Sequence, residues 1–285
     1  TFSLSGAITA SASQTVDSDT NDPTQPAVSN DTINNPQLIS NPITLGGYIN
    51  VPGTGPAGRS RESGDIDDYF QVDLLAGQRI TMLVGDFEEA DADLYLSDLQ
   101  GNIVDFSIDT GEVETLLVPE DGTYLVNAFA FAGATNYIIA IGSPNEAAQY
   151  RPQEYKIIPW QAIVTYKDDD PKTLKSNPGG GVARSMGLQE SAGGPGRARL
   201  MVLSQGLVDA QQKQQRLGGA GQKLNAMHDP EMRARWETLL TVKSLRRDPR
   251  VLHADPNYEV FTQAAPNDTA SPLQWHYPLI ALPDA

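Results

Sequence analysis

An acidic segment near the start of the chain carries oxygen ligands at alternate positions. Asp17, Asp19 and Asn21 are spaced by two, and Asp22 follows directly, within the turn-prone stretch VDSDTNDPTQP. Hard cations such as Ca²⁺ take roughly 6–8 oxygen ligands, and side chains of this kind supply them. The stretch is not an EF-hand loop, because Asp22 stands where that loop needs glycine and Val28 where it needs a bidentate glutamate. It is therefore either half of a cation site that recruits remote ligands or a solvated acidic leader.

The charge of the 285-residue chain is divided unevenly along its length. Residues 1–150 hold 3 Lys/Arg against 22 Asp/Glu, a net charge of −19, whereas residues 151–285 hold 17 against 14, a net charge of +3. This length and this charge step predict two compact units with different roles. Nucleic acid is excluded as a partner of the first unit, because its phosphates would be repelled, and cations are favoured instead.

The residues give no support for cysteine chemistry, a membrane span or an export signal. The chain has no cysteine, so disulfides, thiolate catalysis and Cys-ligated zinc are excluded. No run approaches the roughly 18 apolar residues that a membrane span needs. The start, Thr1-Phe2-Ser3-Leu4, has neither a basic nor an apolar signal region, so we expect any export signal to have been removed or not included.

Residues 43–142 have the pattern of an all-β unit. Short alternating or apolar runs recur about every 8–12 residues, as in Phe70-Gln71-Val72-Asp73-Leu74, with turn residues such as Ala76-Gly77-Gln78 between them. The pattern predicts a β-sandwich or jelly roll, and no helix is needed to explain it.

The same residues resemble the bacterial pre-peptidase C-terminal domain. Five landmarks occur in order over about 80 residues: GDIDDYF from Gly64, LAGQ from Leu75, ADLYL from Ala92 with Gly101-Asn102, DGTY from Asp121, and GATNY from Gly133. The resemblance implies a small β-sandwich attached to secreted peptidases and related to the collagen-binding modules of clostridial collagenases. Such domains usually follow a catalytic domain, whereas here the module comes first.

The resemblance also implies where the remote ligands of a calcium site would lie. In the related collagen-binding modules, an N-terminal acidic segment shares calcium with a carboxylate near the GDxD landmark, which nominates Asp65, Asp67 and Asp68. The predicted metal ligands are therefore Asp17, Asp19, Asn21, Asp22, Asp65, Asp67 and Asp68, and the predicted cofactor is Ca²⁺. The second acidic stretch, DFEEADAD at 86–93, is better explained as a solvated loop.

After Gly142 the pattern changes to mixed strands and helix. Residues 144–155 read as a linker, 156–166 as a β-rich run in which Pro159 indicates an edge or a bulge, and 168–197 as a Gly-rich insertion. Asp229-Pro230 predicts a helix start, and Asp248-Pro249 its end. An apolar stripe near period 3.6 supports that helix, and its members are Met232, Trp236, Leu239, Leu240, Val242, Lys243 and Leu245. A strand over 199–203 and a last strand over 251–261 complete the unit.

Leu245 to Val260 resembles the end of the inhibitory propeptides of subtilisin-like serine proteases. In these a helix closing in L..DP.V feeds a final strand ending in PNY.V, as RRDPRVLHADPNYEV does here. The resemblance implies a ferredoxin-like α+β unit that acts as intramolecular chaperone and active-site inhibitor of a secreted bacterial protease. Residues 265–285 resemble the first residues of that protease domain.

A propeptide of this class ends in an extended inhibitory tail. The predicted tail and cleavage region is Asn257, Tyr258, Glu259, Val260, Phe261, Thr262, Gln263, Ala264 and Ala265, with the cut between Phe261 and Asn267. The chain lacks the Asp-Thr/Ser-Gly, His-Gly-Thr-His and Gly-Thr-Ser-Met elements of the triad, so it is predicted to be non-catalytic, with the cognate catalytic domain as partner. His228, His253 and His276 lack a catalytic context and are expected to be structural.

The predicted fold is mainly β plus α+β: a β-sandwich or jelly roll followed by a ferredoxin-like unit. The predicted divisions are an acidic leader (1–40), the sandwich (41–143), the linker (144–155), the propeptide unit (156–263) and the start of a protease domain (264–285). The alternative function is a calcium-dependent adhesion or matrix-binding module, with the rest of the chain as its tether.

Overall fold

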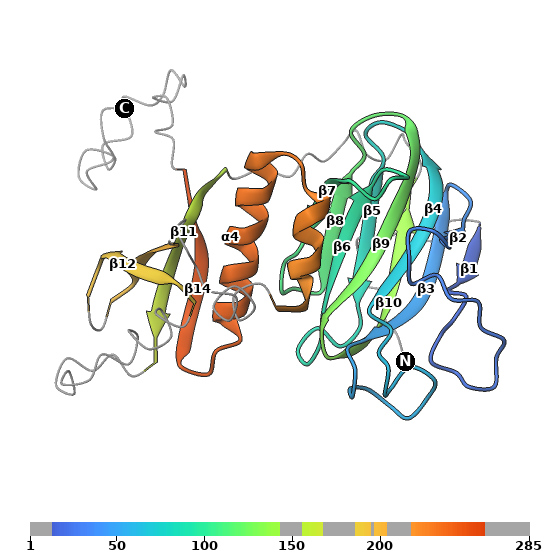
Figure 1. Ribbon diagram of the computed structural model, residues 1–285, viewed down its shortest axis with the longest axis horizontal. Helices are drawn as coiled ribbons and strands as arrows, with labels where there is room; N and C mark the ends of the chain where they lie inside the picture. The colour runs from blue at the N-terminus through green and yellow to red at the C-terminus, as the bar shows by residue number, and fades with distance from the viewer. Residues whose placement is uncertain (1–12, 143–155, 168–185, 195–196, 204–217, 260–285) are drawn as a thin grey trace, which may run out of the picture.

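The computed structural model describes residues 13–142, 156–167, 186–194, 197–203 and 218–259. Strands dominate these residues, and they form two five-stranded sheets and one four-stranded sheet (Figure 1). None of the helices among them is long and apolar enough to cross a membrane.

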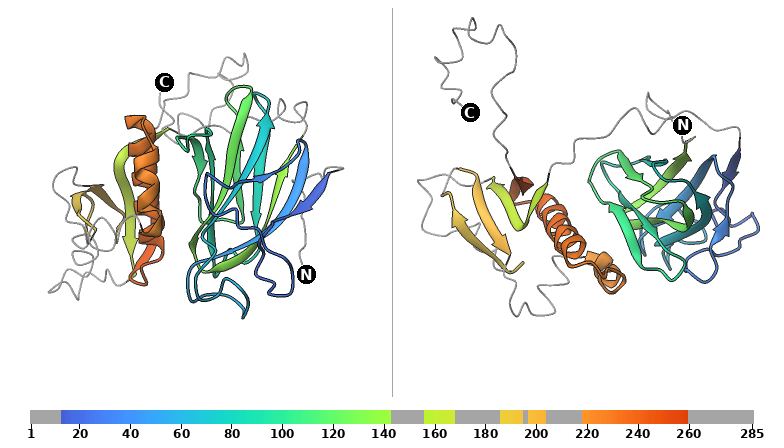
Figure 2. Two further views of the ribbon diagram at one scale, coloured as in Figure 1. Left: turned by 45° about the vertical axis from the view of Figure 1, so that its right-hand side comes forward. Right: turned by 90° about the horizontal axis from the view of Figure 1, so that it is seen from above.

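Residues 13–142 form a β-sandwich of two facing sheets (Figure 2). One sheet has the order β1-β3-β10-β5-β8 and the other the order β2-β4-β9-β6-β7. The strands are β1 Gln14–Val16, β2 Gln37–Leu38, β3 Ile43–Asn50, β4 Asp67–Leu74, β5 Arg79–Val84, β6 Asp91–Ser97, β7 Ile103–Ser107, β8 Val113–Leu117, β9 Gly122–Ala132 and β10 Ala134–Ile141. The β-sandwich prediction is confirmed, and no helix occurs within 43–142.

Alternation along the strands builds the sandwich core. Phe70, Val72 and Leu74 of β4 point inward and meet Ile139 and Ile141 of β10 in one buried cluster. Successive side chains of a strand point to opposite faces, so the residues between them face outward. Each sheet therefore has one core face and one outer face.

The segment predicted as an acidic leader belongs in part to the sandwich. β1 pairs in parallel with β3, and β2 pairs in parallel with β4. The Asp17 amide continues the first pairing by donating to the Gly46 carbonyl at 2.8 Å. The expectation of a separate leader over 1–40 is therefore wrong for residues 13–40, because backbone pairing fixes both of its ends to the sheets.

The second unit is a four-stranded antiparallel sheet in the order β12-β13-β11-β14. Its strands are β11 Ile157–Tyr166, β12 Leu188–Ala192, β13 Arg199–Leu203 and β14 Val251–Tyr258. A 3₁₀ helix, η1 Gly218–Ala226, and helix α4 Pro230–Arg246 precede β14. Core residues of the sheet, including Val164 and Met201, pack against Val242 and Leu245 of α4.

Three details of this unit differ from the sequence-based expectation. β12 lies inside the segment that was predicted as a Gly-rich insertion. Of the two alternatives for Pro159, the edge is wrong because β11 is a central strand, whereas the bulge agrees with the register shift between Ile157 and Ala162 in the pairing with β14. β14 ends at Tyr258 rather than at Phe261.

Helix α4 begins and ends where its capping residues predict. The Asp229 carboxylate accepts a hydrogen bond from the Glu231 amide at 2.9 Å, and Pro230 occupies the first helical position, where no amide donor is needed. Lys243 and Arg246 in the last turn oppose the negative end of the helix dipole. The helix lies between the second unit's sheet and the sandwich (Figures 1 and 2).

We predict that Asp229→Ala lowers the free energy of unfolding by about 1 kcal/mol, because an N-cap acceptor is lost. Asp229→Asn, which keeps a side-chain oxygen at the cap, retains most of that stability. Denaturant unfolding followed by tryptophan fluorescence measures both variants. Equal midpoints for Asp229→Ala and the unchanged chain would contradict the capping role.

Candidate metal site

Four aspartates from two segments converge at one end of the sandwich. Asp17 and Asp19 follow β1, Asp65 lies two positions before the start of β4, and Asp68 lies on β4. Each offers a carboxylate oxygen, and these oxygens all lie within 4.8 Å of one another. All four side chains are buried, from Asp68, which has no exposed surface, to Asp19 at 8%. We call Asp17, Asp19, Asp65 and Asp68 the acidic cluster.

Backbone pairing holds the acidic cluster in place. Asp65 exchanges two backbone hydrogen bonds with Asn50 at the end of β3, at 2.7 and 2.9 Å. The loop that carries Asp17 and Asp19 is closed by the Val28 amide, which donates to the Ser18 carbonyl at 3.0 Å. The Tyr137 hydroxyl on β10 donates to Asp68 Oδ2 at 2.5 Å. The carboxylates are therefore positioned by the fold before any ligand binds.

Several oxygens of the acidic cluster have no hydrogen-bond donor. Both oxygens of Asp17, Oδ1 of Asp19, Oδ2 of Asp65 and Oδ1 of Asp68 are buried without a partner. None of the four carboxylates forms an ion pair with a Lys or Arg in the described part of the chain. Burying unpaired carboxylates is costly, so the cluster requires either protons or a cation.

The raised pKa values of the acidic cluster indicate the same need for protons or a cation. Burial raises the pKa of Asp17 from 3.8 to about 6. Burial, together with repulsion from Asp17, raises the pKa of Asp19 and that of Asp65 to about 8. Burial likewise holds the pKa of Asp68 well above its ordinary value. An all-oxygen, anionic and preformed set of this kind suits a hard divalent cation such as Ca²⁺.

Three of the residues predicted as ligands lie elsewhere. The Asn21 side chain accepts from the Ser60 amide at 3.0 Å. The exposed Asp22 caps a local turn by accepting from the Thr24 amide at 2.8 Å. Asp67 points to the opposite face of the sheet from Asp68, because they are adjacent on a strand, and it pairs with Lys223. The structure thus brings together four of the seven predicted residues.

The structure adds Asn30, which the sequence analysis did not nominate. Asn30 is 1% exposed, its side chain lies beside Asp17, and its Oδ1 has no hydrogen-bond partner. It stands 13 positions after Asp17, and only the closed loop between Ser18 and Val28 brings it back. No spacing rule in the sequence carries that signal.

The predicted inhibitory tail is only partly within the described residues. Asn257 and Tyr258 belong to β14, and the side-chain amide of Asn257 donates to Gln161 Oε1 at 2.8 Å. The Glu259 amide donates to the Lys156 carbonyl at 2.8 Å. Asn257, Tyr258 and Glu259 are therefore part of the folded unit, and Val260 to Ala265 lie outside the described residues.

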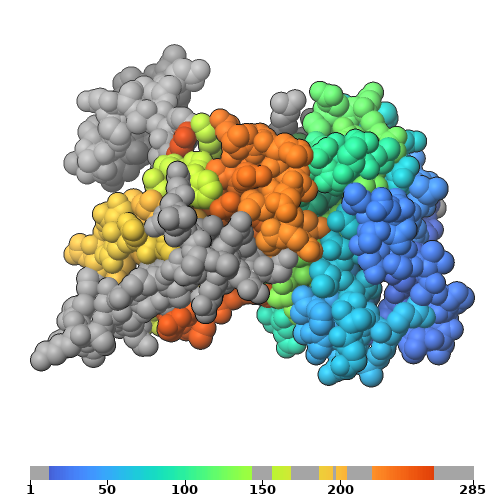
Figure 3. All heavy atoms as spheres, in the orientation of Figure 1, coloured from blue at the N-terminus to red at the C-terminus, as the bar shows by residue number. Residues whose placement is uncertain are grey.

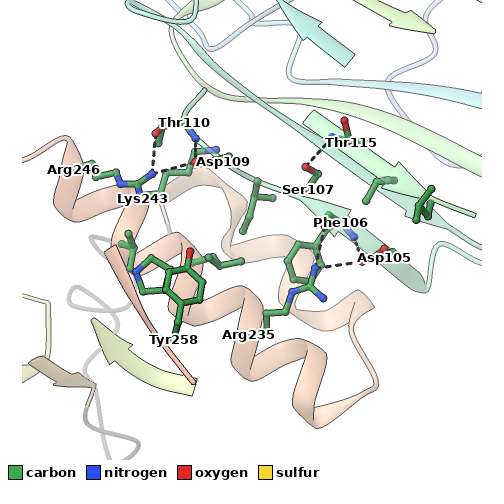
Figure 4. Close-up of a pocket in the computed structure, with 16 residues that line it drawn as sticks. Asp105, Phe106, Ser107, Asp109, Thr110, Thr115, Arg235, Lys243, Arg246 and Tyr258 are labelled. Atoms are coloured by element: carbon green, nitrogen blue, oxygen red, sulfur yellow. Dashed lines mark hydrogen bonds and ion pairs between the residues drawn. The ribbon is translucent and has the colours of Figure 1, made fainter. Parts of the chain in front are cut away.

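A cavity of about 310 Å³ lies away from the acidic cluster, where the sandwich meets the second unit (Figure 4). Its walls come from β7, β8, α4 and the end of β14. Arg246 closes one side by donating to Asp109 at 3.1 Å and Thr110 at 3.0 Å. Arg235 lies on the other side against Asp105 and the Phe106 ring. Both guanidinium groups are already paired within the chain.

Comparisons with known proteins do not assign the chain to a family. Neither the family models nor the curated proteins include a match to the chain. Among solved structures, the pre-peptidase C-terminal domain of a Bacillus anthracis collagenase is 15% identical, covers 37% of this chain and 93% of its own, and has a TM-score of 0.29. The periplasmic inhibitors of g-type lysozyme, PliG, from Aeromonas hydrophila and Salmonella Typhimurium are 13% and 18% identical and each cover 37% of this chain and 98% of their own, with TM-scores of 0.23 and 0.22. The β-sandwich assignment rests on the strand order and core of this chain.

We predict that the metal-free chain loses stability as pH rises from about 6 to 9. The folded carboxyls of Asp17, Asp19 and Asp65 hold protons with pKa values of about 6 to 8, against 3.8 ordinarily. Their contribution is therefore complete below about pH 4 and is lost as pH passes through the folded values. Melting temperatures measured in EDTA across this range test the prediction.

The double variant Asp17→Asn/Asp65→Asn should show a flatter pH profile, because two of the titrating groups are gone. Asp22→Asn should keep the original profile, since Asp22 is exposed and its pKa is lowered. A melting temperature that rises with pH in EDTA would contradict the assignment.

Proposed function

We propose that the chain is the N-terminal pro-region of a secreted, subtilisin-like serine endopeptidase and inhibits the catalytic domain that follows it. The single observation that carries this proposal is the order of the second unit's sheet. With β11 counted as strand one, the order β12-β13-β11-β14 reads 2-3-1-4, which is the antiparallel arrangement of ferredoxin-like units. The helix-to-strand passage from Leu245 to Tyr258 has the L..DP.V and PNY landmarks of such propeptides.

Among the described residues, the face of this sheet opposite α4 is uncovered, which supports docking onto a globular partner. Ala162 and Val164 of β11 point to α4 and are fully buried, whereas Gln161 and Ile163 alternate with them and are only half-buried. Leu200 and Val202 continue the half-buried row on β13. One face of the sheet is thus covered by α4, and the other offers an apolar centre to the catalytic domain.

The residues after Glu259 would then act as the inhibitory tail. An extended segment adds to the edge of a substrate cleft by backbone hydrogen bonds, which is β-augmentation. Cleavage within the tail would leave a product-like inhibitor in the cleft. The preformed sheet would also speed folding of the catalytic domain, because distant strands of such a fold must otherwise meet against the entropy of loop closure.

For the sandwich, we propose a structural Ca²⁺ held by Asp17, Asp19, Asp65 and Asp68, with Asn30 as a further ligand. The buried carboxylate oxygens without partners support this proposal. Ca²⁺ would supply the positive charge that no Lys or Arg of the described residues brings to the acidic cluster. The rival function, calcium-dependent matrix adhesion, has less support because α4 covers the outer face of one of the two sheets.

We predict that Ca²⁺ raises the melting temperature of the chain and that EDTA reverses the shift. Calcium at about 100 times its Kd corresponds to about 2.7 kcal/mol of stabilisation. Asp68→Asn should remove most of the shift, whereas Asp22→Asn should keep it, because Asp22 lies outside the acidic cluster. An unchanged midpoint with Ca²⁺, or equal losses in the two variants, would contradict the ligand set.

We also predict that the full chain inhibits the cognate catalytic domain, produced separately, with slow-binding kinetics and a nanomolar constant. Ending the chain at Glu259 should weaken inhibition by roughly 100-fold or more, since the segment that enters the cleft is lost. A chain ending at Asn267 is the matched control and should inhibit fully. Absence of inhibition by the full chain would refute the proposed function.

A further inference from the structure

Helix α4 is buried on both of its sides, by two different sheets. Thr238, Val242 and Leu245 face the second unit, where the Trp160 amide donates to Thr238 Oγ1 at 2.8 Å. Trp236 and Leu240 face the sandwich, and both are fully buried. In Figure 3 the atoms of the helical segment (orange) lie directly against those of the sandwich (green). We call this contact between residues 218–247 and the outer face of the β2-β4-β9-β6-β7 sheet the seam.

The apolar part of the seam is one continuous cluster. Leu224 and Met227, which precede α4, join Trp236 and Leu240 against Tyr95, Phe106 and Phe129 of the sandwich. The Trp236 indole donates to the Tyr95 hydroxyl at 3.2 Å. The cluster draws on both units, so neither unit buries it alone.

Lys223 enters a first socket on the sandwich. Its ammonium contacts Asp67 Oδ1 at 2.5 Å, Asn127 Oδ1 at 2.7 Å and the Tyr69 hydroxyl at 3.1 Å. The ammonium also lies 4.8 to 5.2 Å from the ring centres of Tyr69, Tyr95 and Phe129. Carboxylate, amide and aromatic faces together replace the water that the ammonium loses on burial.

Lys243, in the last turn of α4, enters a second socket on the sandwich. The side chain is 1% exposed, and its ammonium contacts Asp91 Oδ1 at 2.7 Å and also Asp93. The Phe131 ring centre lies 4.6 Å from the ammonium. Asp91 and Asp93 belong to the acidic stretch at 86–93, which was expected to be a solvated loop. Both are buried and pair with Lys243, so that expectation is wrong for these two residues.

In the ion pairs across the seam, the second unit supplies the cations and the sandwich supplies the carboxylates. The cations Lys223, Arg235, Lys243, Arg246 and Arg247 come from the second unit, and the carboxylates that they meet on the sandwich are Asp67, Asp91, Asp93, Asp105 and Asp109. The acidic first half and the basic second half of the sequence thus meet at the seam, where their opposite charges pair. Complementary charge of this kind fixes the partner and its register more than it adds affinity.

We propose that the outer face of the β2-β4-β9-β6-β7 sheet is a docking surface for the basic helical segment 218–247, specified by the two lysine sockets. The sandwich therefore holds the second unit without help from the peptide that connects them. It is a component of the inhibitor, and the two units leave as one body when the pro-region is released. The joint release rests on the proposed function, whereas the docking of the two units on each other concerns the seam alone and does not depend on inhibition of any protease.

The test uses the full chain with a site-specific protease sequence inserted between residues 148 and 149. After cutting under native conditions, the two fragments should co-elute in size-exclusion chromatography and appear as one complex in native mass spectrometry. Lys223→Met and Lys243→Met should each weaken the complex by at least about 100-fold, since each leaves buried carboxylate without its partner. Lys156→Met removes an exposed lysine outside the seam and is the matched control.

A variant on the sandwich side separates lost docking from misfolding of the second unit. Asp67→Asn changes nothing in the second unit, yet it should also weaken the complex. In the uncut Lys243→Met chain, hydrogen exchange should quicken in α4 while β3 and β10 stay protected. Separation of the unmodified fragments, or lysine variants that bind as tightly as Lys156→Met, would overturn the docking surface even if the full chain inhibits its protease.

Discussion

The arrangement of the chain depends on a helix that needs two partners. A typical surface helix has one apolar stripe and one solvated side. Helix α4 instead buries Val242 and Leu245 against its own sheet and Trp236 and Leu240 against the sandwich. Neither layer alone would cover it, so the sandwich provides half of the environment in which the second unit folds. The two units predicted from the charge step are therefore energetically linked.

The sandwich manages its buried carboxylates in two contrasting ways. On its outer face, Asp67, Asp91 and Asp93 are neutralised by lysines from the helical segment. In the acidic cluster, Asp17, Asp65 and Asp68 receive no cation from the described chain. The charge of the first set is neutralised by lysines of the same chain, whereas the second set needs a proton or a metal ion. That difference separates an interface from a binding site.

The sequence predicts what local rules control and misses what the fold brings together. Asp229-Pro230 and Asp248 marked the ends of α4, and turn-bounded alternation marked the sandwich strands, because caps and period-two patterns act over a few residues. Asn30 and the lysine sockets escaped prediction. Lys223 and Asp67 stand 156 positions apart, and Lys243 already stood in the apolar stripe without any local sign of what would neutralise it.

The neighbouring residues Asp67 and Asp68 show how closely the two environments are joined. One strand sends the first to a lysine and the second into the acidic cluster, a separation of a single peptide unit. A one-residue insertion or deletion at the start of β4 would turn each of the two carboxylates to the opposite face of the sheet, away from its present partners. Single side chains of the seam or of the acidic cluster can thus be replaced one at a time, whereas the length of β4 is constrained by both sites at once.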